Sequence, residues 1–499
     1  IVQRMTSLAA LFTVGGLCMY TLGRQHMLDG NRSTGIAYII TGLVFFGGLA
    51  VLSKETGFLL PLYMLVIEVS LFRFRNQAGL TCKVIAGFFG IVLVLPLFLF
   101  LLVLLTNPES LLNYHSREFT LVERVLTEAR VLIFYLKMII MPSISELGLY
   151  HDDIALSRGL LDPPSTLYSI LGLAALLVTA VALLGKRPLA SLGILWFFAG
   201  HALESTIFQL DIAYEHRNYL ADMGIFLALF SLAAQQNVTR LAHIARAVIP
   251  VFFLVLISYT TWLRAEQWSD NINHAIYEAR HHPESYRAVY AAARIYARLA
   301  VLHQPGAEEK AYEYLDRASA LNEADIMADA VKIKLSYILD KPVKQEWFDD
   351  ILTKVGKEPV RPARITSLYN LMDCIGDPCD IPLDTMDNIF RTALSVDSLA
   401  YLPRLHAELL NVYGYFTINK ANNPGRGLAL FSRAIEIHPH EPQRWINLVQ
   451  LQIFLQDYDN AERTLQSFRE SDAHIGVVKE IQELQDEINT PVSYTHLRA

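Results

Sequence analysis

The segregation of apolar residues constrains this chain more than any other feature. Residues 1–264 consist largely of long apolar runs separated by short polar connections, whereas charges are scattered at ordinary soluble density from 265 onward. A helix of about 20 apolar residues can cross about 30 Å of hydrocarbon. We therefore expect an all-α protein, with a polytopic transmembrane helix bundle over 1–264 and a second helical domain over 265–490.

About eight apolar runs are long enough to span a membrane. They are 5–23, 36–53, 57–72, 84–106, 166–184, 189–208, 220–235 and 247–263. A further apolar stretch near 125–141 contains Glu128, Arg130 and Lys137. We expect this stretch to form an interfacial or re-entrant helix rather than another span, because its charges must face water or protein.

Basic residues in the short connections set the expected orientation, because such residues concentrate on the cytoplasmic side. They fall in alternate connections, at Arg24, Arg32, Arg73, Arg75, Lys83, Lys186, Arg187, Arg240 and Arg246. From this alternation we expect residues 265–490 to lie in the periplasm, or in an equivalent extracytoplasmic space, and we expect a bacterial inner-membrane protein. The net charge of −7 gives no basic field, so nucleic acid is not an expected partner. The apolar spans make the lipid bilayer an expected partner.

The second half shows helix pairs with the spacing of tetratricopeptide repeats, in which small residues let paired helices pack closely. The clearest pairs lie at 442–465, 283–318 and 403–439, whereas 325–400 is helical but degenerate. Stacked pairs of this kind present a concave surface, and we expect a protein or peptide to bind there. A scaffold without a ligand is the alternative.

Two cysteines, Cys374 and Cys379, lie in a loop-like segment on the side expected to be oxidising. We expect a disulfide between them, with two free thiols as the alternative. A structural zinc site is not expected, because a second pair of ligands is missing.

Polar side chains gather at the outer ends of the expected spans, where charge is costly unless it is paired or faces a cavity. Arginine suits a phosphate, and nearby carboxylates suit proton transfer or a divalent cation. We expect Arg4, Lys54 and Arg217 to bind a lipid phosphate. The expected supporting residues are Gln3, Glu55, His151, Asp152, His201, Glu204, Glu215, His216 and Tyr219. The alternative is that Lys54–Glu55 and Glu215–Arg217 are local ion pairs.

These segments also carry a family resemblance. In order, Val2-Gln3-Arg4-Met5-Thr6-Ser7-Leu8-Ala9, Ser53-Lys54-Glu55-Thr56-Gly57 with Pro61, and Glu215-His216-Arg217-Asn218-Tyr219-Leu220, followed by tetratricopeptide-like repeats, resemble TMTC-type membrane glycosyltransferases of the GT-C superfamily. The resemblance implies transfer of a sugar from a polyprenyl-phosphate donor to a protein or glycan acceptor on the periplasmic face. Family members carry catalytic acids in an outer loop that we expect upstream of Ile1, so the catalytic residues stay unassigned and this chain alone is expected to be inactive.

Two other functions remain open at this point. The first is a polymerase or ligase of surface polysaccharide that uses a lipid-linked glycan. The second is a non-enzymatic, membrane-anchored assembly factor that uses its repeats to recruit partners. We also expect residues 491–499 to be a sequencing artefact outside the fold, because they interrupt the helical pattern.

Overall fold

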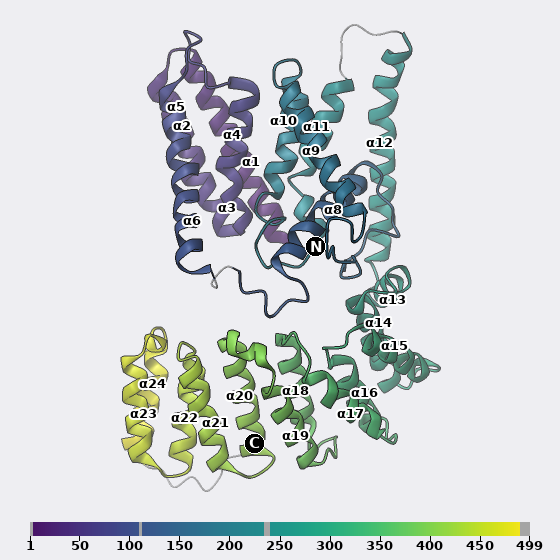
Figure 1. The fold of residues 1–499 in the computed structure, drawn as a ribbon, viewed down its shortest axis with the longest axis vertical. Helices are drawn as coiled ribbons and strands as arrows, with labels where there is room; N and C mark the ends of the chain where they lie inside the picture. Colours follow the sequence, from purple (N-terminus) through teal and green to yellow (C-terminus); the bar gives the residue numbers. More distant parts are fainter. Residues whose placement is uncertain (1–2, 109–111, 234–239, 490–499) are drawn as a thin grey trace. The chain divides into compact units, whose positions relative to one another are not determined.

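The computed structural model describes residues 3–108, 112–233 and 240–489, with the side chains of 240–247 excepted. The expected artefact at 491–499 lies outside these residues. Every regular element in the described ranges is a helix (Figure 1), as the sequence predicts. Contacts divide the chain into two compact units. Unit 1 comprises Ile1–Tyr114 and Phe119–Ala288, and unit 2 comprises His115–Glu118 and Val289–Ala499.

The division falls after Ala288, whereas the change in composition lies near Arg264. Helix α13 (Asn271–His281) and the residues after it up to Ala288 belong to unit 1 because they bond to the loop that follows α8 (Leu121–Ile140). The Asp153 carboxylate lies 2.7 Å from His282 Nδ1, and Asp152 accepts a hydrogen bond from Ser285 Oγ. These polar contacts could not be read from hydropathy.

Unit 1 contains all of the apolar helices. Their bounds are α1 (Arg4–Leu28), α2 (Arg32–Thr41), α3 (Gly47–Ser53), α4 (Leu60–Ile67), α5 (Lys83–Phe89), α6 (Leu95–Thr106), α8 (Leu121–Ile140), α9 (Ser165–Leu183), α10 (Pro188–His201), α11 (Asp222–Ala233) and α12 (Arg240–Gln267). Turns of π-helix join α2 to α3 and α5 to α6 without a break, and Glu55–Leu59 is a 3₁₀ turn that leads into α4.

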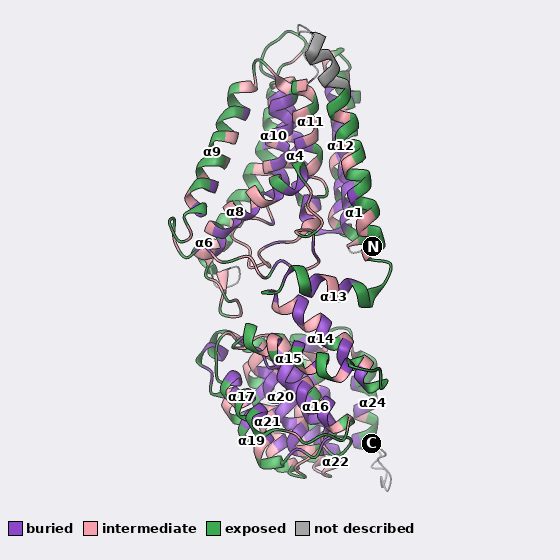
Figure 2. Cartoon of the chain, turned by 90° about the vertical axis from the view of Figure 1, so that its right-hand side faces the viewer, coloured by how far each residue is buried: buried purple, intermediate pink, exposed green. Residues whose placement is uncertain are grey.

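In the described part of the chain, six helical segments are long and apolar enough to cross a membrane. They are Arg4–Leu28, Arg32–Ser53, Glu55–Phe72, Lys83–Thr106, Ser165–Leu183 and Val248–Gln267. The helices α10 and α11 are apolar but shorter. Much of the apolar surface faces outward, as on α9 and α12 in Figure 2. Large exposed apolar faces on helices of this length are what lipid contact requires.

Two expected boundaries differ from the structure. Arg24 was expected in a connection, but α1 continues past it, because the Glu68 carboxylate neutralises the buried guanidinium with bonds of 2.7 and 3.0 Å. The run 189–208 was expected to be helical throughout, but α10 ends at His201. Beyond this point, the backbone carbonyls of Glu204, Thr206 and Leu210 accept hydrogen bonds from the Arg124 side chain.

The stretch expected near 125–141 forms the single helix α8, which begins at Leu121. A capping box fixes this start, since Thr120 Oγ1 accepts a bond from the Glu123 N–H and the Glu123 carboxylate accepts one from Thr120. One face of α8 is buried, at Arg124, Thr127, Glu128, Val131 and Tyr135. This spacing of three and four residues is that of an amphipathic helix, and α8 is not among the six segments apolar enough to span.

Helices α10 and α11 pack with their backbones in contact. A Cβ atom added to Gly193 would lie 2.2 Å from the carbonyl oxygen of Gly224, and one added to Gly224 would lie 2.4 Å from that of Gly193. Small residues permit such close packing of apolar helices, where van der Waals contact replaces the hydrophobic driving force. Tyr20, Tyr63 and Trp196 fill the adjacent core between α1, α4 and α10.

Unit 2 consists of helices in sequence with short connections. Their bounds are α14 (Tyr286–Val301), whose first turn belongs to unit 1, α15 (Ala307–Leu321), α16 (Met327–Ile338), α17 (Gln345–Val355), α18 (Pro362–Cys374), α19 (Leu383–Leu394), α20 (Pro403–Asn419), α21 (Pro424–Ile437), α22 (Pro442–Phe454), α23 (Tyr458–Glu470) and α24 (Val478–Asn489). Contacts link α16 to α18 and α18 to α20, and likewise α17 to α19. Alternate helices therefore pack side by side.

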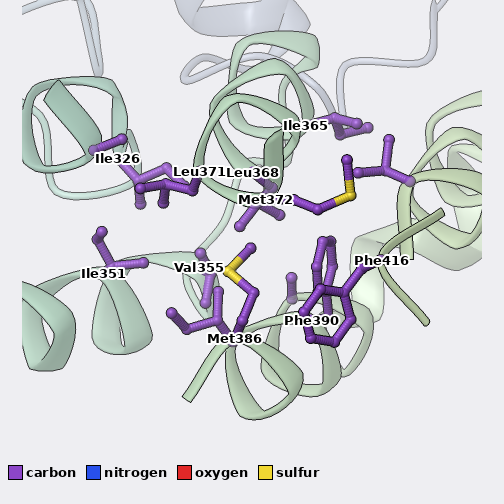
Figure 3. Packing of buried hydrophobic residues seen from close by; sticks show 14 of the residues in the cluster. Ile326, Ile351, Val355, Ile365, Leu368, Leu371, Met372, Met386, Phe390 and Phe416 are labelled. Atoms are coloured by element: carbon purple, nitrogen blue, oxygen red, sulfur yellow. The ribbon is translucent and has the colours of Figure 1, made fainter. Parts of the chain in front are cut away.

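The core of unit 2 lies between these helices. Figure 3 shows Leu368 and Met372 of α18 facing Met386 and Phe390 of α19, with Phe416 of α20 beside them. Each is almost fully buried, so this packing joins successive helices. The Sγ atoms of Cys374 and Cys379 are bonded in a disulfide at the edge of this core, with their Cα atoms 5.2 Å apart.

Candidate functional site

A narrow polar pocket lies in unit 1, between the N-terminal half of α1, the α3–α4 connection and the chain that follows α10. Its walls include Thr6, Ala9, Ala10, Thr13, Lys54, Thr56, Leu59, Tyr63, Gly200, Glu204, His216, Arg217 and Leu220. Its volume of about 30 Å³ admits one or two water-sized groups. Four residues singled out from the sequence, Lys54, Glu204, His216 and Arg217, thus lie around one pocket.

Lys54 is positioned by the break between α3 and α4. Its backbone is extended, which ends α3 and turns the side chain toward the chain after α10. Its Nζ lies 3.0 Å from Glu204 Oε1, with both residues buried, but 4.0 Å from the exposed Glu55. The expected local Lys54–Glu55 pair is therefore present, but at a longer distance than the buried pair with Glu204. Burial favours the carboxylate that loses water together with the lysine.

Arg217 does not pair with Glu215, which corrects the second local alternative. The residue is buried, and its Nη1 and Nη2 donate to the backbone carbonyls of Ile212 and Asp211 at 3.0 and 2.8 Å. The guanidinium also stacks over the Tyr214 ring. A guanidinium has five N–H donors, so these two bonds leave other donors of Arg217 that can bind a ligand in the pocket.

Arg124 is an organising residue that the sequence reading missed. Its fully buried guanidinium donates to the carbonyls of Glu204 at 2.8 Å and Thr206 at 3.0 Å, and also to that of Leu210. This is why the chain after His201 is not helical. The sequence did contain a signal for this role. Arg124 is spaced at helical intervals from Thr127 and Val131, so it lies on the same face of α8, and this position predicts that its side chain is buried.

Glu128, one turn after Arg124, is a second buried charge of this region. Its carboxylate lies 3.0 Å from an Arg124 Nη atom. Burial raises the pKa of Glu128 to about 7, although the positive charges of Arg124 and Arg217 oppose this increase. A carboxyl group that titrates near neutral pH can both accept and donate a proton.

Two histidines flank the pocket in different ways. Burial, together with the positive charges of Lys54 and Arg217, lowers the pKa of His216 to about 4, so its ring is neutral at pH 7. His201 is buried beside the rings of Tyr135 and Phe197, at centroid distances of 5.4 and 4.7 Å. We assign His201 a packing role at the end of α10.

Glu215 and His151 belong to a separate polar cluster. Glu215 accepts a bond of 2.7 Å from the backbone N–H of Gly148, and its carboxylate lies 3.4 Å from His151 Nε2 and 3.6 Å from an Arg264 Nη atom. Asp152 accepts from Ser285 and from the Arg287 backbone. These contacts anchor the loop after α8 to the helices that follow α12, and none of these residues lines the pocket.

Three expected site residues also lie outside the pocket walls. Gln3 is half-buried and begins α1 with a positive φ of 63°. Arg4 and Tyr219 are exposed. The structure therefore gathers Lys54 and Arg217 at one site but does not place Arg4 with them.

Within the described residues, no group of three or more His, Cys, Asp or Glu side chains is arranged to hold a metal ion. The divalent cation suggested by the sequence accordingly has no ligand set in that part of the chain. No protein-family model matches the chain, and no curated protein matches its sequence.

Proposed function

We propose that this protein is a membrane glycosyltransferase of the GT-C type, which moves a sugar from a polyprenyl-phosphate donor to a protein or glycan acceptor on the periplasmic face. The observation that carries the proposal is the convergence of Lys54, His216 and Arg217 on one pocket, from connections that are far apart in sequence. A membrane protein that buries two cations beside a half-buried, neutral histidine at a helix end has assembled a site suited to an oxyanion.

The lipid phosphate binds at the mouth of this pocket, with one oxygen atom entering it. Lys54 uses one of its three N–H donors on Glu204 and directs others to the phosphate. Arg217 is fixed by two backbone carbonyls and offers its remaining donors. Both cations stabilise the negative charge that grows on the phosphate as the bond from the sugar's anomeric carbon to the phosphate oxygen breaks.

The acceptor hydroxyl attacks the anomeric carbon and loses its proton to a base, and polyprenyl phosphate departs. The resemblance to GT-C enzymes implies that this base is a carboxylate of another outer loop. His216, neutral at pH 7, is suited to hydrogen bonding with the departing phosphate rather than to adding a third positive charge. A polymerase or ligase that uses a lipid-linked glycan would make the same contacts to the lipid phosphate. The identity of the acceptor therefore distinguishes that enzyme from the proposed glycosyltransferase.

Unit 2 supplies a surface for the acceptor. A groove of about 450 Å³ is lined by one face of α16, at Met327, Ala330, Val331 and Lys334, and one face of α18, at Ala363, Thr366, Ser367, Asn370 and Leu371, together with Tyr290. Hydroxyl, amide and apolar groups in one groove suit an extended polypeptide. Under the assembly-factor alternative, this groove would carry the whole function and the pocket around Lys54 would be dispensable.

The deciding experiment uses the full-length protein that carries this sequence, reconstituted with polyprenyl-phosphate sugars and a peptide acceptor. We expect sugar transfer, and we expect Lys54→Gln to reduce it at least about 10-fold through the loss of a charge-assisted contact. Lys137→Gln is the matched control, because Lys137 is an exposed lysine paired with Glu146. Absence of transfer from every donor, or equal transfer by both variants, would refute the proposal.

A further inference from the structure

A second, larger cavity of unit 1 lies at the opposite end of α1 from the Lys54 pocket. Its volume is about 990 Å³, and its lining comprises Arg24, Met27, Gly30, Arg32, Asn76, Gln77, Ala78, Leu80, Thr81, Cys82, Lys83 and Val84. The Lys54 pocket begins at Thr6, and the 18 helical steps from Thr6 to Arg24 correspond to about 27 Å. The two sites therefore lie near opposite boundaries of a bilayer.

The floor of this cavity is formed by a buried arginine. Arg24 is fully buried, and its Nε and Nη2 donate to Glu68 at 2.7 and 3.0 Å. Nη2 also donates to the Arg75 carbonyl, and Nη1 donates to the Met27 sulfur at 4.0 Å. Because the side chain is fully buried, Arg24 holds the wall of the cavity in place through these bonds.

The rim adds positive charge that is not neutralised. Arg32 and Lys83 are exposed side chains of the lining, and neither forms an ion pair with another described residue. No carboxylate is among the lining residues, while Asn76, Gln77 and Thr81 supply neutral polar groups. Because Glu68 balances Arg24, the cavity presents the charge of two cations.

Hydrogen bonds within the protein hold the hairpin of residues 74–82, which forms one wall. Cys82 N–H donates to the Phe74 carbonyl at 2.6 Å, and the Phe74 N–H donates to Glu68 at 2.8 Å. The Asn76 side chain accepts from the Leu80 N–H at 2.9 Å. The same carboxylate thus fixes both Arg24 and the hairpin, which reduces the entropy lost on binding.

We propose that this cavity binds the phosphate group of an anionic phospholipid in the leaflet opposite the Lys54 pocket. The exposed Arg32 and Lys83 contact and neutralise the phosphate, and the buried Arg24–Glu68 pair beneath them fixes the wall of the cavity. Met27, Leu80 and Val84 form apolar walls for the part of the lipid next to its headgroup. A soluble phosphate would use the same cations but would gain nothing from these walls. The inference rests on the membrane placement of unit 1 and not on the glycosyltransferase proposal.

The test measures lipid binding by the full chain in nanodiscs or detergent, with phosphatidylglycerol and phosphatidylcholine as probes. We expect preferential binding of phosphatidylglycerol, and a decrease of about 10- to 30-fold in its affinity in the double variant Arg32→Gln/Lys83→Gln. The matched control is Lys186→Gln/Arg187→Gln, which removes two cations from another connection of the same expected face without touching the cavity lining. Equal loss in both variants would attribute the preference to the basic face as a whole and overturn the site.

Two further measurements keep the result interpretable if a variant folds poorly. In a Cys18→Ser background of otherwise native sequence, phosphatidylglycerol should slow alkylation of Cys82, which lines the cavity. Unchanged labelling of Cys82 at saturating lipid would contradict the proposal. The second measurement replaces the lipid with millimolar inorganic phosphate. If phosphate protected Cys82 from alkylation as well as phosphatidylglycerol does, the ligand would be a soluble phosphate and not a lipid. If sugar transfer were absent while phosphatidylglycerol still protected Cys82 from alkylation, only the proposed glycosyltransferase function would be contradicted.

Discussion

Lys54 donates a hydrogen bond of 3.0 Å to Glu204, 150 residues away in sequence, although its direct neighbour Glu55 is also a carboxylate. Both partners are buried, whereas Glu55 is 60% exposed. This pair joins the α3–α4 connection to the chain after α10 and fixes one wall of the candidate site. The Lys54–Glu204 pair forms because Glu204 is buried in the same low-dielectric environment as the lysine, whereas Glu55 is in water.

Removing one member of this pair should destabilise unit 1. We expect Glu204→Gln to lower the free energy of unfolding by about 3 kcal/mol, because Lys54 is left as a buried charge without its partner. Glu55→Gln is the control and should cost less than about 0.5 kcal/mol, since exposed pairs are screened by water. Thermal unfolding in detergent measures both. Similar effects of the two changes would contradict the assignment of the pair.

Arg217 should contribute to the order of the loop after α10 as well as to ligand binding. Arg217→Ala removes two bonds to backbone carbonyls, and we expect a loss of about 1.5–3 kcal/mol in stability together with a 10- to 100-fold decrease in transfer rate. Arg217→Lys should recover only part of the stability and of the transfer rate, because an ammonium group cannot reproduce the planar, two-pronged hydrogen bonding of a guanidinium. If turnover per folded molecule stayed normal in Arg217→Ala, the residue would have only its structural role.

The contact between His282 and Asp153 predicts a pH dependence in the anchoring of the loop after α8. The hydrogen bond to Asp153, and its charge with those of Glu278 and Asp152, raise the pKa of His282 above 6.5, in spite of burial. Burial acts to raise the pKa of Asp153, but the bond to His282 and the charges of His282 and His151 hold it below 3.8.

The sign of this dependence follows from the two shifts. The stabilisation of the folded state by protonated His282 is fully present below pH 6.5 and is lost as the pH rises through the raised pKa of His282. The stabilisation by ionised Asp153 is lost as the pH falls below about 3.8. Hydrogen exchange of residues 148–153 should therefore accelerate above neutral pH beyond the ordinary base-catalysed increase. His282→Gln should abolish this excess. An identical pH profile in wild type and variant would exclude the mechanism.

The pair Cys374–Cys379 should resist alkylation until a reductant is added, if unit 2 lies in an oxidising compartment. We expect Cys374→Ser/Cys379→Ser to lower stability by about 2 kcal/mol, a value set by the short loop that the bond closes. Mass spectrometry of alkylated protein measures the first point and denaturant unfolding the second. Labelling of both cysteines before reduction would contradict the expected compartment.

Orientation is tested independently of chemistry. A topology reporter fused after Arg264 should report the periplasm, and one inserted at Lys186 should report the cytoplasm, because the connections differ in basic content. A cytoplasmic signal from the first fusion would overturn the expected periplasmic location of unit 2. The same result would remove the basis for the disulfide in the cell.

The sequence by itself determined the all-helical class, the approximate positions of the apolar helices and the change in character between the two halves. These properties depend on composition and period, which are local. It also indicated that Lys54, Glu204, His216 and Arg217 needed partners, because charged or polar groups at the ends of apolar helices are costly when left alone.

Only the tertiary structure decided which partners they have. Lys54 lies closer to Glu204 than to Glu55, and Arg217 donates to backbone carbonyls instead of pairing with Glu215. Arg124, from a different helix, binds the carbonyls that follow α10. Arg24 became the floor of a cavity through Glu68, 44 residues away. Such choices depend on which groups are buried together, and burial is a property of packing between distant segments that no local pattern of residues contains.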